Sequence, residues 1–194
     1  AGNFSQTLDL EAKYGNVDMG HLGEARIDVG YVGNMTCKDA KTLTIESKYS
    51  KLDMGKIHKL ELEEKYGNLS VVSLDRGNIS LKYGDAVIGL LNDELSVDDL
   101  GYGSLTVEEV SPSFTHINVE ARYGNLYLKI PEKTAFKVNA EGMRYGNYSL
   151  DGFHVTSSER EEKRHYRSEV NGGGNRQIYF NGNNYSNLKI KAIK

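Results

Sequence analysis

Several residue types that mark other classes of protein are scarce in this chain of 194 residues. Trp is absent, Pro occurs twice, and the single cysteine, Cys37, leaves no second thiol for a disulfide or for a metal site built on two cysteines. No apolar run approaches the roughly 18 residues of a membrane-spanning helix, and no signal peptide is present. The net charge of -3 gives little attraction for a phosphate backbone, so nucleic acid is not expected as a partner.

The residues that are abundant favour turns and strands. Gly occurs 21 times and Tyr 13 times, a balance typical of many chain reversals and few helices. Cys37 shares the apolar side of its segment with Met35, so we expect a buried and unreactive thiol. The five histidines share no common place in the repeat described below and no metal-ligand spacing. We therefore predict no cofactor and no metal site.

A short motif, Tyr-Gly-Asn-Leu at residues 66–69, returns with small changes along the chain. The tyrosines that anchor it are Tyr14, Tyr31, Tyr49, Tyr66, Tyr83, Tyr102, Tyr123, Tyr145 and Tyr185. All steps between them except the last measure 17 to 22 residues. A fixed short period is the signature of a stacked repeat, in which each unit buries its apolar face against the next.

Apolar and polar residues alternate on both sides of each anchor. Around Tyr66 the apolar positions are Leu60, Leu62, Leu69 and Val71. A period of two predicts strands with one buried face, and the same parity places the anchor ring on the inward side. The parity changes across Gly-Asn, so we expect a turn there, with the positive backbone torsion φ on the glycine. A third apolar position, eight residues past the anchor, predicts a further corner; Leu22 and Ile57 are examples.

A unit of about 17 residues cannot bury its apolar face alone, but it can when stacked on copies of itself. We therefore predict an all-β fold, a right-handed single-stranded parallel β-helix (β-solenoid) of about nine coils, each of ~17 to 22 residues, with an irregular C-terminal cap. The handedness follows from the rule for parallel crossover connections.

Regularity divides this single domain, residues 1–194, into three parts. Residues 1–150 carry the regular coils. Residues 151–177 break the period and include the charged run 157–169, which indicates a polar insertion, either a loop or a hairpin. Residues 178–194 return to strand alternation, and we expect these terminal strands to belong to a cap, because an exposed sheet edge at the end of a solenoid invites aggregation.

The chain resembles a bacterial family over essentially its whole length. Short Gly-rich repeats, the corner at Gly172–Gly174 and an alternating last strand with Leu188 and Ile190 look like adhesin β-helix domains, the head domains of envelope proteins. The Tyr-Gly-Asn consensus is sharper here than in that family. The resemblance implies an extracytoplasmic protein, in the periplasm, associated with the outer membrane or on the cell surface, seen here as a mature or truncated chain. A lipid anchor on a segment outside this sequence is compatible with it, and the family supplies no catalytic residues.

Two columns of side chains are expected to stabilise the stack as structural ladders. The first contains Tyr14, Tyr49, Tyr66, Tyr83, Tyr102, Tyr123 and Tyr145, which we expect to be stacked and partly buried at one corner. The second contains Asn16, Asn68, Asn125 and Asn147, a row suited to hydrogen bonds between coils. An alternative for the tyrosines is an aromatic stripe that binds sugars.

The outward positions also carry charge rows. Acids lie three residues before most anchors, as Glu63 does, and bases lie one residue before, as Lys65 does. The first interpretation is a solvated face on which rows of opposite sign compensate each other. The second is a groove for charged glycans.

The two largest polar departures from the repeat supply the candidate binding residues, because loops on a rigid scaffold often carry binding. They are Asp93, Glu94, Asp98 and Asp99 in an acidic bulge, and Arg160, Lys163, Arg164 and Arg167 in the charged C-terminal segment. Carboxylates suit calcium, but the Gly-Gly-x-Gly-x-Asp repeat of calcium-binding solenoids is missing. A solvated loop and an end cap are the alternatives to binding.

The preferred functional hypothesis is a non-enzymatic protein of the bacterial cell envelope or surface, an adhesin or structural β-helix module. Its expected partner is a cell-surface glycan or an envelope protein. The alternative is a carbohydrate-binding or carbohydrate-active protein that resembles polysaccharide lyases and hydrolases, an analogy at the level of fold. Glycosidases need two carboxyls about 5 to 9.5 Å apart on one face, and the sequence offers no such pair with a basic or aromatic platform beside it.

Overall fold

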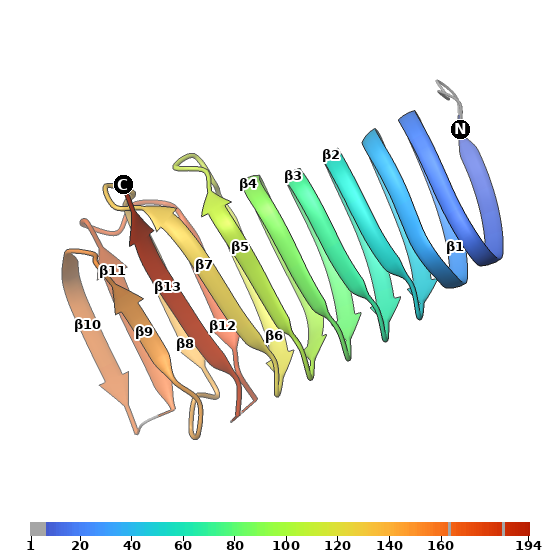
Figure 1. Ribbon diagram of the computed structural model, residues 1–194. Coiled ribbons are helices and arrows are strands. Elements are labelled where there is room, and N and C mark those ends of the chain that lie inside the picture. Colours follow the sequence, from blue (N-terminus) through green and yellow to red (C-terminus); the bar gives the residue numbers. More distant parts are fainter. Residues whose placement is uncertain (1–6, 163, 184) are drawn as a thin grey trace.

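A computed structural model describes residues 7–162, 164–183 and 185–194, which form strands and turns and no helix. The strands are β1 (Leu8–Lys48), β2 (Lys51–Lys65), β3 (Asn68–Lys82), β4 (Asp85–Gly101), β5 (Ser104–Val110), β6 (His116–Arg122), β7 (Asn125–Pro131), β8 (Phe136–Glu141), β9 (Tyr148–Asp151), β10 (Val155–Glu161), β11 (His165–Val170), β12 (Gln177–Asn181) and β13 (Asn187–Ile193). Strands β1 to β4 pair in parallel with their neighbours along the chain, and the chain winds as a rod (Figure 1). The predicted all-β parallel solenoid is confirmed.

The register of this pairing explains the core. Ile45 pairs with Leu62, and Leu62 pairs with Ile79, so each apolar side chain lies on its equivalent in the next coil. These three side chains are at most 5% exposed. One buried cluster runs through the molecule and includes Leu62 and Val119, with Leu10 packed against it. The coils therefore share one continuous core, as their alternation predicts.

The turn at each anchor differs from the prediction in one respect. Tyr66 has a φ of 64°, and every anchor from Tyr14 to Tyr123 lies in the same left-handed region. The parity change therefore falls on the tyrosine, one residue earlier than expected, and it turns the ring out of the core. Tyr66 is 46% exposed, so the expectation of inward-facing anchor rings is wrong.

The glycine after the anchor serves a different purpose from the one predicted. Among these glycines only Gly15 has a positive φ. A Cβ on Gly84 would lie 1.8 Å from the carbonyl oxygen of Gly67, and a Cβ on Gly103 would lie 1.8 Å from that of Gly84. At Gly84 and Gly103 the backbones of successive coils approach too closely for a side chain, whereas Ser50 and Ser186 occupy the same place in two other coils.

The C-terminal strands occupy an unexpected place in the stack. β12 pairs in parallel with β6 on one side and with β8 on the other, while β13 pairs with β7 and β9 (Figure 1). Residues 177–193 thus form a coil that is inserted between two coils made earlier in the chain. The prediction that residues 178–194 cap the end is wrong, because both edges of these strands are paired.

The number of turns and the order of the last anchors also differ from the prediction. The solenoid makes about five turns with parallel stacking rather than the nine predicted. Beyond Gly101 each coil is divided into separate strands. The last anchors do not stack in chain order either, because the ring of Tyr185 lies between those of Tyr123 and Tyr145.

A charged hairpin closes the C-terminal end of the stack. β10 and β11 pair antiparallel, and β11 pairs antiparallel with β8. All side chains of β10 are exposed. The polar insertion within residues 151–177 is therefore a hairpin, and it covers the edge of β8 that would otherwise be unpaired.

Candidate functional site

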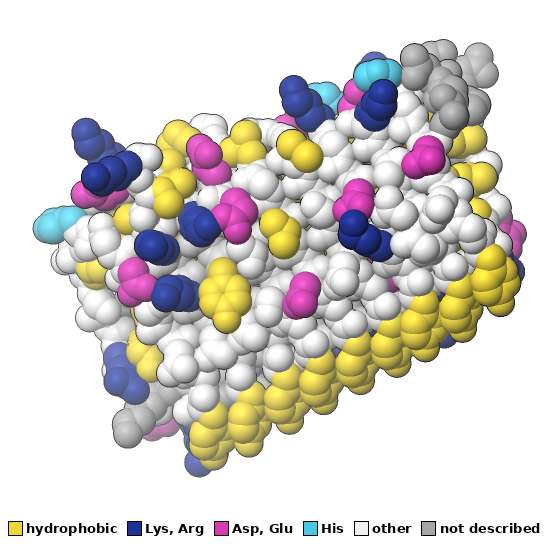
Figure 2. All heavy atoms as spheres, in the orientation of Figure 1, with side chains coloured by type: hydrophobic (Ala, Val, Ile, Leu, Met, Phe, Trp, Pro, Cys, Tyr) yellow, Lys and Arg dark blue, Asp and Glu magenta, His cyan; other side chains and the backbone are white. Residues whose placement is uncertain are grey.

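The anchor tyrosines form an exposed ridge along one edge of the rod (Figure 2). The tyrosine ridge consists, in spatial order, of Tyr14, Tyr31, Tyr49, Tyr66, Tyr83, Tyr102, Tyr123, Tyr185 and Tyr145. Neighbouring ring centroids are 4.9 to 5.7 Å apart, and their planes differ by 2 to 23°. Exposure ranges from 42% at Tyr49 to 75% at Tyr14. The rings therefore stack between coils, as expected, but outside the core.

The asparagines beside the ridge connect the coils by hydrogen bonds. The side-chain oxygen Oδ1 of Asn68 accepts a bond of 3.0 Å from the backbone N–H of Asp85 in the next coil. The Oδ1 of Asn16 accepts one of 3.0 Å from Asn34 in the same way. At the other end Asn187 Nδ2 donates to Asn125 Oδ1 over 2.6 Å. The first two bonds satisfy backbone groups at the turn, and the third joins two side chains, so the role of these asparagines is structural.

The charge rows on the face before the ridge pair with each other. Lys65 Nζ lies 2.6 Å from Glu63 Oε1, and Lys13 Nζ lies 3.0 Å from Glu11 Oε1. The hydrogen bond from Lys65 lowers the pKa of Glu63, and the same contact raises the pKa of Lys65. This compensation agrees with the solvated-face interpretation and leaves little net charge for a glycan groove on that face.

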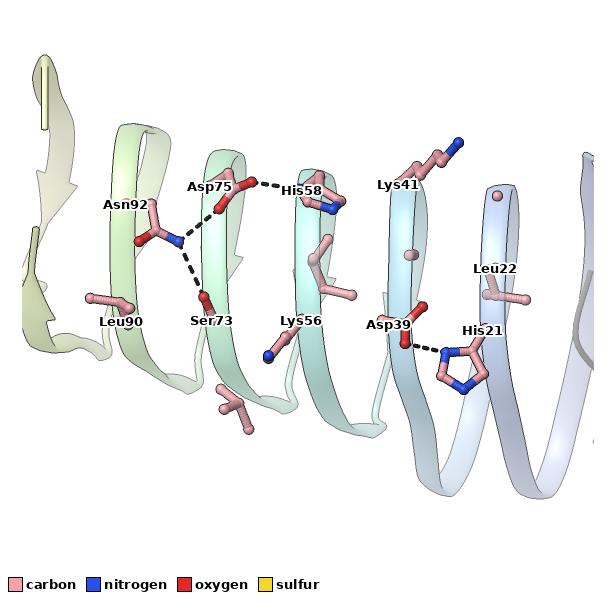
Figure 3. Close-up of a pocket in the computed structure, with 14 residues that line it drawn as sticks. His21, Leu22, Asp39, Lys41, Lys56, His58, Ser73, Asp75, Leu90 and Asn92 are labelled. Carbon is pink, nitrogen blue, oxygen red and sulfur yellow. Dashed lines mark hydrogen bonds and ion pairs between the residues drawn. The ribbon is translucent and has the colours of Figure 1, made fainter. Parts of the chain in front are cut away.

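A second candidate site is a trough at the third corner of the coils (Figure 3). We call it the corner trough. Its two rims are His21, Asp39, Lys56, Ser73 and Leu90 on one side, and Gly23, Lys41, His58, Asp75 and Asn92 on the other. Between the rims lie Leu22, Ala40 and Ile57, whose side chains are at most 4% exposed and belong to the core, and Val72 is the exposed apolar side chain of the lining. The hollow has a volume of about 1130 Å³ and runs along the rod across the coils of β1 to β4.

Polar contacts hold the rims in place. Nδ1 of His21 contacts Asp39, and Nδ1 of His58 contacts Asp75. Asn92 Nδ2 donates to Asp75 Oδ1 over 2.7 Å. Such contacts between neighbouring coils fix donors and acceptors along the trough, and a small number of placed polar groups is what orients a ligand in a small-molecule or sugar site.

The trough contains two lysines, Lys41 and Lys56. Lys56 and Lys41 lie on opposite rims, on adjacent coils, and neither makes an ion pair within the part of the chain that the structure describes. Their ammonium groups remain available to a ligand. Asp39 and Asp75 balance their charge, so the trough as a whole is close to neutral.

The acidic bulge does not form one site. Asp93 Oδ2 lies 2.9 Å from Arg76 Nε, and this hydrogen bond holds the pKa of Asp93 below its usual value. Asp99 Oδ2 lies 2.8 Å from Arg122 Nη2 and 3.2 Å from Lys82 Nζ. These carboxylates pair with bases on the coils to either side rather than with one another.

The two other acids of the bulge make weaker contacts. Glu94 Oε1 accepts from Thr115 Oγ1 over 3.3 Å, and Asp98 accepts from Ser96 Oγ over 3.4 Å. Among the residues placed in the structure, no group of three or more His, Cys, Asp or Glu side chains is arranged to hold a metal ion.

The basic candidates of the C-terminal segment lie on the end hairpin. The guanidinium of Arg160 lies 5.1 Å from the ring centroid of Tyr166, and Arg167 Nη1 lies 3.3 Å from Glu161 Oε1. Arg164 accepts a bond from the backbone N–H of Met143 through its carbonyl. Lys163 lies outside the described residues. The hairpin thus has structural contacts of its own, and no concavity brings its described bases together with the acidic bulge.

Two reactive groups are sealed in the core. Burial raises the pKa of the Cys37 thiol to about 11, so the thiol is neutral and inert, as the sequence predicts. Burial also raises the pKa of Glu64 to about 7, against weaker opposing contributions from the Ser47 hydroxyl and the backbone of Ser50. Glu64 is 0% exposed, so no substrate can reach it.

Sequence reasoning located the third corner but missed the trough on it. Leu22 and Ile57 marked the apolar position, yet the polar residues one step to either side were not connected. His21 and His58 lie seven and nine residues past their anchors, on opposite rims of one trough. Polar residues at positions seven and nine after the anchor, on either side of the apolar position, were therefore the signal in the sequence for this trough.

Comparisons with protein-family models, with curated proteins and with solved structures find no match. Within the described ranges there is no helix long and apolar enough to cross a membrane.

Proposed function

We propose that the chain is a non-enzymatic module of the bacterial cell envelope or surface, a right-handed β-solenoid that binds an extended cell-surface glycan along the corner trough. The trough is the observation that carries this proposal. It is open, follows the long axis of the rod, and presents hydrogen-bond donors, acceptors and charges of both signs beside the exposed Val72. A linear polymer of sugars fits these features, because its hydroxyl groups need both donors and acceptors.

The family resemblance supports the extracytoplasmic location and the adhesive or structural role. The trough adds a place for recognition on the regular coils. Its rim residues differ from one coil to the next, so each coil offers different contacts to a ligand that lies along the rod. Contacts at several coils raise the affinity of a long chain above that of its fragments.

The geometry gives less support to the carbohydrate-active alternative. A general acid needs a raised pKa and access to substrate. Among the described carboxyls, the one with a raised pKa is Glu64, which is buried. In the trough, Asp39 and Asp75 lie on opposite rims of non-adjacent coils, and each contacts a histidine. The two carboxyls are therefore not placed as an acid and a base on either side of one glycosidic bond.

A glycan array tests the proposal. The parent chain should bind a subset of bacterial surface glycans and prefer longer chains. The double variant Lys56→Ala/His58→Ala removes one trough cation and one rim contact, and we expect binding to fall roughly tenfold or more, as for loss of polar contacts in a preformed site. Lys133→Ala, at an exposed turn away from the trough, is the matched control. Equal binding by all three proteins would contradict the proposal.

A further inference from the structure

The tyrosine ridge is an exposed apolar surface that the glycan proposal does not use. Outside it, the exposed large apolar side chains of the described residues are the isolated Val72, Val87, Tyr127 and Val155. The ridge by contrast is continuous along one whole edge of the rod (Figure 2). Continuous exposed apolar surface marks an interaction site.

The stacking determines which part of each ring a partner can touch. Tyr66 lies between Tyr49, at 4.9 Å and 10°, and Tyr83, at 5.0 Å and 6°. Both faces of the ring are therefore covered by other rings, and the ring edges and hydroxyls remain exposed. A sugar that stacks on an aromatic side chain needs a free ring face. The aromatic-stripe interpretation for sugars is therefore disfavoured along the ridge.

The straightness of the ridge restricts the partner further. Each ring is fixed at the same corner of its coil, so all ring edges reach the same height in one row. A compact protein would contact only a few of them. The partner that uses the whole row is flat and extends over the length of the rod.

The chemistry of the row resembles that of side chains at a membrane–water interface. Tyrosine has an apolar body and a polar tip, and it is enriched where one end of a side chain is dry and the other wet. A row of bases precedes the ridge by one residue: Lys13, Lys48, Lys65, Lys82, Arg122 and Arg144. Lys48 Nζ lies 5.4 Å from the ring centroid of Tyr49, and the Arg144 guanidinium lies 5.1 Å from that of Tyr145. Such side chains reach lipid phosphates while their stems stay on apolar surface.

We propose that the tyrosine ridge rests on an anionic lipid surface, with the rod parallel to the membrane and the rings at the level of the headgroups. Lys65 and Lys13 already pair with acids of the neighbouring row, and Lys82 and Arg122 pair with Asp99. Lys48 and Arg144 make cation–π contacts and no ion pair within the described residues. Apolar contact by the ring edges therefore dominates, and the charge adds a preference for anionic lipid.

This orientation is compatible with the corner trough. The rims lie seven and nine residues past the anchor in a repeat of about 17 residues, as Lys56 and His58 do after Tyr49. The trough is thus about half a coil away from the ridge. A rod that rests on its ridge presents the trough away from the membrane.

Vesicle binding tests the proposal on the whole chain. Because Trp is absent, the aromatic fluorescence comes from tyrosine. We expect co-sedimentation with vesicles of phosphatidylcholine and phosphatidylglycerol, weaker binding to phosphatidylcholine alone, and quenching of tyrosine fluorescence by lipids brominated near the headgroup. The variant Tyr66→Ser/Tyr83→Ser/Tyr102→Ser should bind roughly tenfold more weakly or worse, since interfacial binding scales with the apolar area buried. Tyr127→Ser, exposed but off the ridge, should bind like the parent.

The triple serine variant loses stacking and can lose stability, so its fold is checked by circular dichroism. If the serine variant unfolds, two other results test the proposal. The first is quenching of tyrosine fluorescence in the parent chain, and the second is vesicle binding by the variant Tyr66→Phe/Tyr83→Phe/Tyr102→Phe, which keeps the stack and should keep binding. No vesicle binding by the parent, no quenching, or equal binding by a folded serine variant would each overturn the proposal. Lys56→Ala/His58→Ala separates the two sites, because it should lose glycan binding and retain vesicle binding.

Discussion

At the scale of single residues, the turn at each anchor combines two constraints. Left-handed backbone at a bulky residue costs on the order of 1–2 kcal/mol, and seven tyrosines from Tyr14 to Tyr123 adopt it. Stacking with two neighbours, worth about 0.5–1.5 kcal/mol per aromatic pair, offsets that cost. The sequence indicated the turn but placed the positive φ on glycine, because glycine is its usual host. Nothing local in the sequence marks a tyrosine as left-handed.

The close approach of the backbones of successive coils can be tested at the glycines that follow the anchor tyrosines. Gly84→Ala should destabilise the chain by several kcal/mol, since the new Cβ would lie 1.8 Å from a carbonyl oxygen and the backbone of two coils would have to separate. Gly30→Ala is the matched control, because its new methyl group would meet no atom within 4 Å and its φ is not positive. It should change stability by less than about 0.5 kcal/mol. Urea unfolding of both variants gives the free energies. Equal effects would show that the coils are not so closely spaced.

Glu64 makes stability depend on pH. Its pKa rises from 4.5 to about 7 on folding, so the folded chain holds this proton more tightly than the unfolded chain. Stability from this group is fully present below pH 4.5 and is lost as pH rises to about 7, by up to about 3 kcal/mol. Glu64→Gln should remove that dependence. The free energy of unfolding of both proteins is measured between pH 5 and pH 8, and the two values should converge at the acid end. A constant difference between the two proteins over this range would contradict a buried carboxyl.

At the scale of strands, the regular coils were predictable and the insertion of the last coil was not. Alternation and a constant step determine which residues face inward, and pairs such as Ile45 with Leu62 follow from them. The alternation of β12 and β13 likewise predicts strands. It contains no information on which neighbours they pair with, because Ile178 would fit equally well beyond β8 or between β6 and β8.

Because β12 and β13 lie between two other coils, substitutions of their core side chains should strongly lower the free energy of unfolding. Phe180 is 0% exposed and lies between Val119 and Ala140 of the flanking coils. Phe180→Ala should cost about 3–5 kcal/mol, as expected for a large core side chain. Val155→Ala, on the exposed β10 of the end hairpin, should cost less than about 1 kcal/mol. Chemical denaturation measures both, and a small effect at Phe180 would indicate a peripheral strand.

At the scale of the whole molecule, the two proposed surfaces lie on different edges of one rigid rod. The sequence placed its candidate binding residues on departures from the repeat, on the view that regular coils are flat and compensated. The structure shows that a corner can be hollow while remaining regular, because the rim side chains stand on both sides of residues whose own side chains are buried in the core. The corner trough extends over the coils from His21 to Asn92, and the departures instead make structural contacts, as Asp99 and Arg167 do.

A single binding measurement that compares the trough with the hairpin tests whether the regular coils carry recognition. Three proteins are titrated with the glycan that the parent binds best: the parent chain, the trough variant Lys56→Ala/His58→Ala and the hairpin variant Arg160→Ala/Arg164→Ala/Arg167→Ala. Their melting temperatures are measured first, to show that both variants are folded. If the regular coils carry recognition, the dissociation constant should rise roughly tenfold or more for the trough variant and stay unchanged for the hairpin variant. The reverse result, with the hairpin variant losing binding and the trough variant retaining it, would contradict the claim that the regular coils carry recognition.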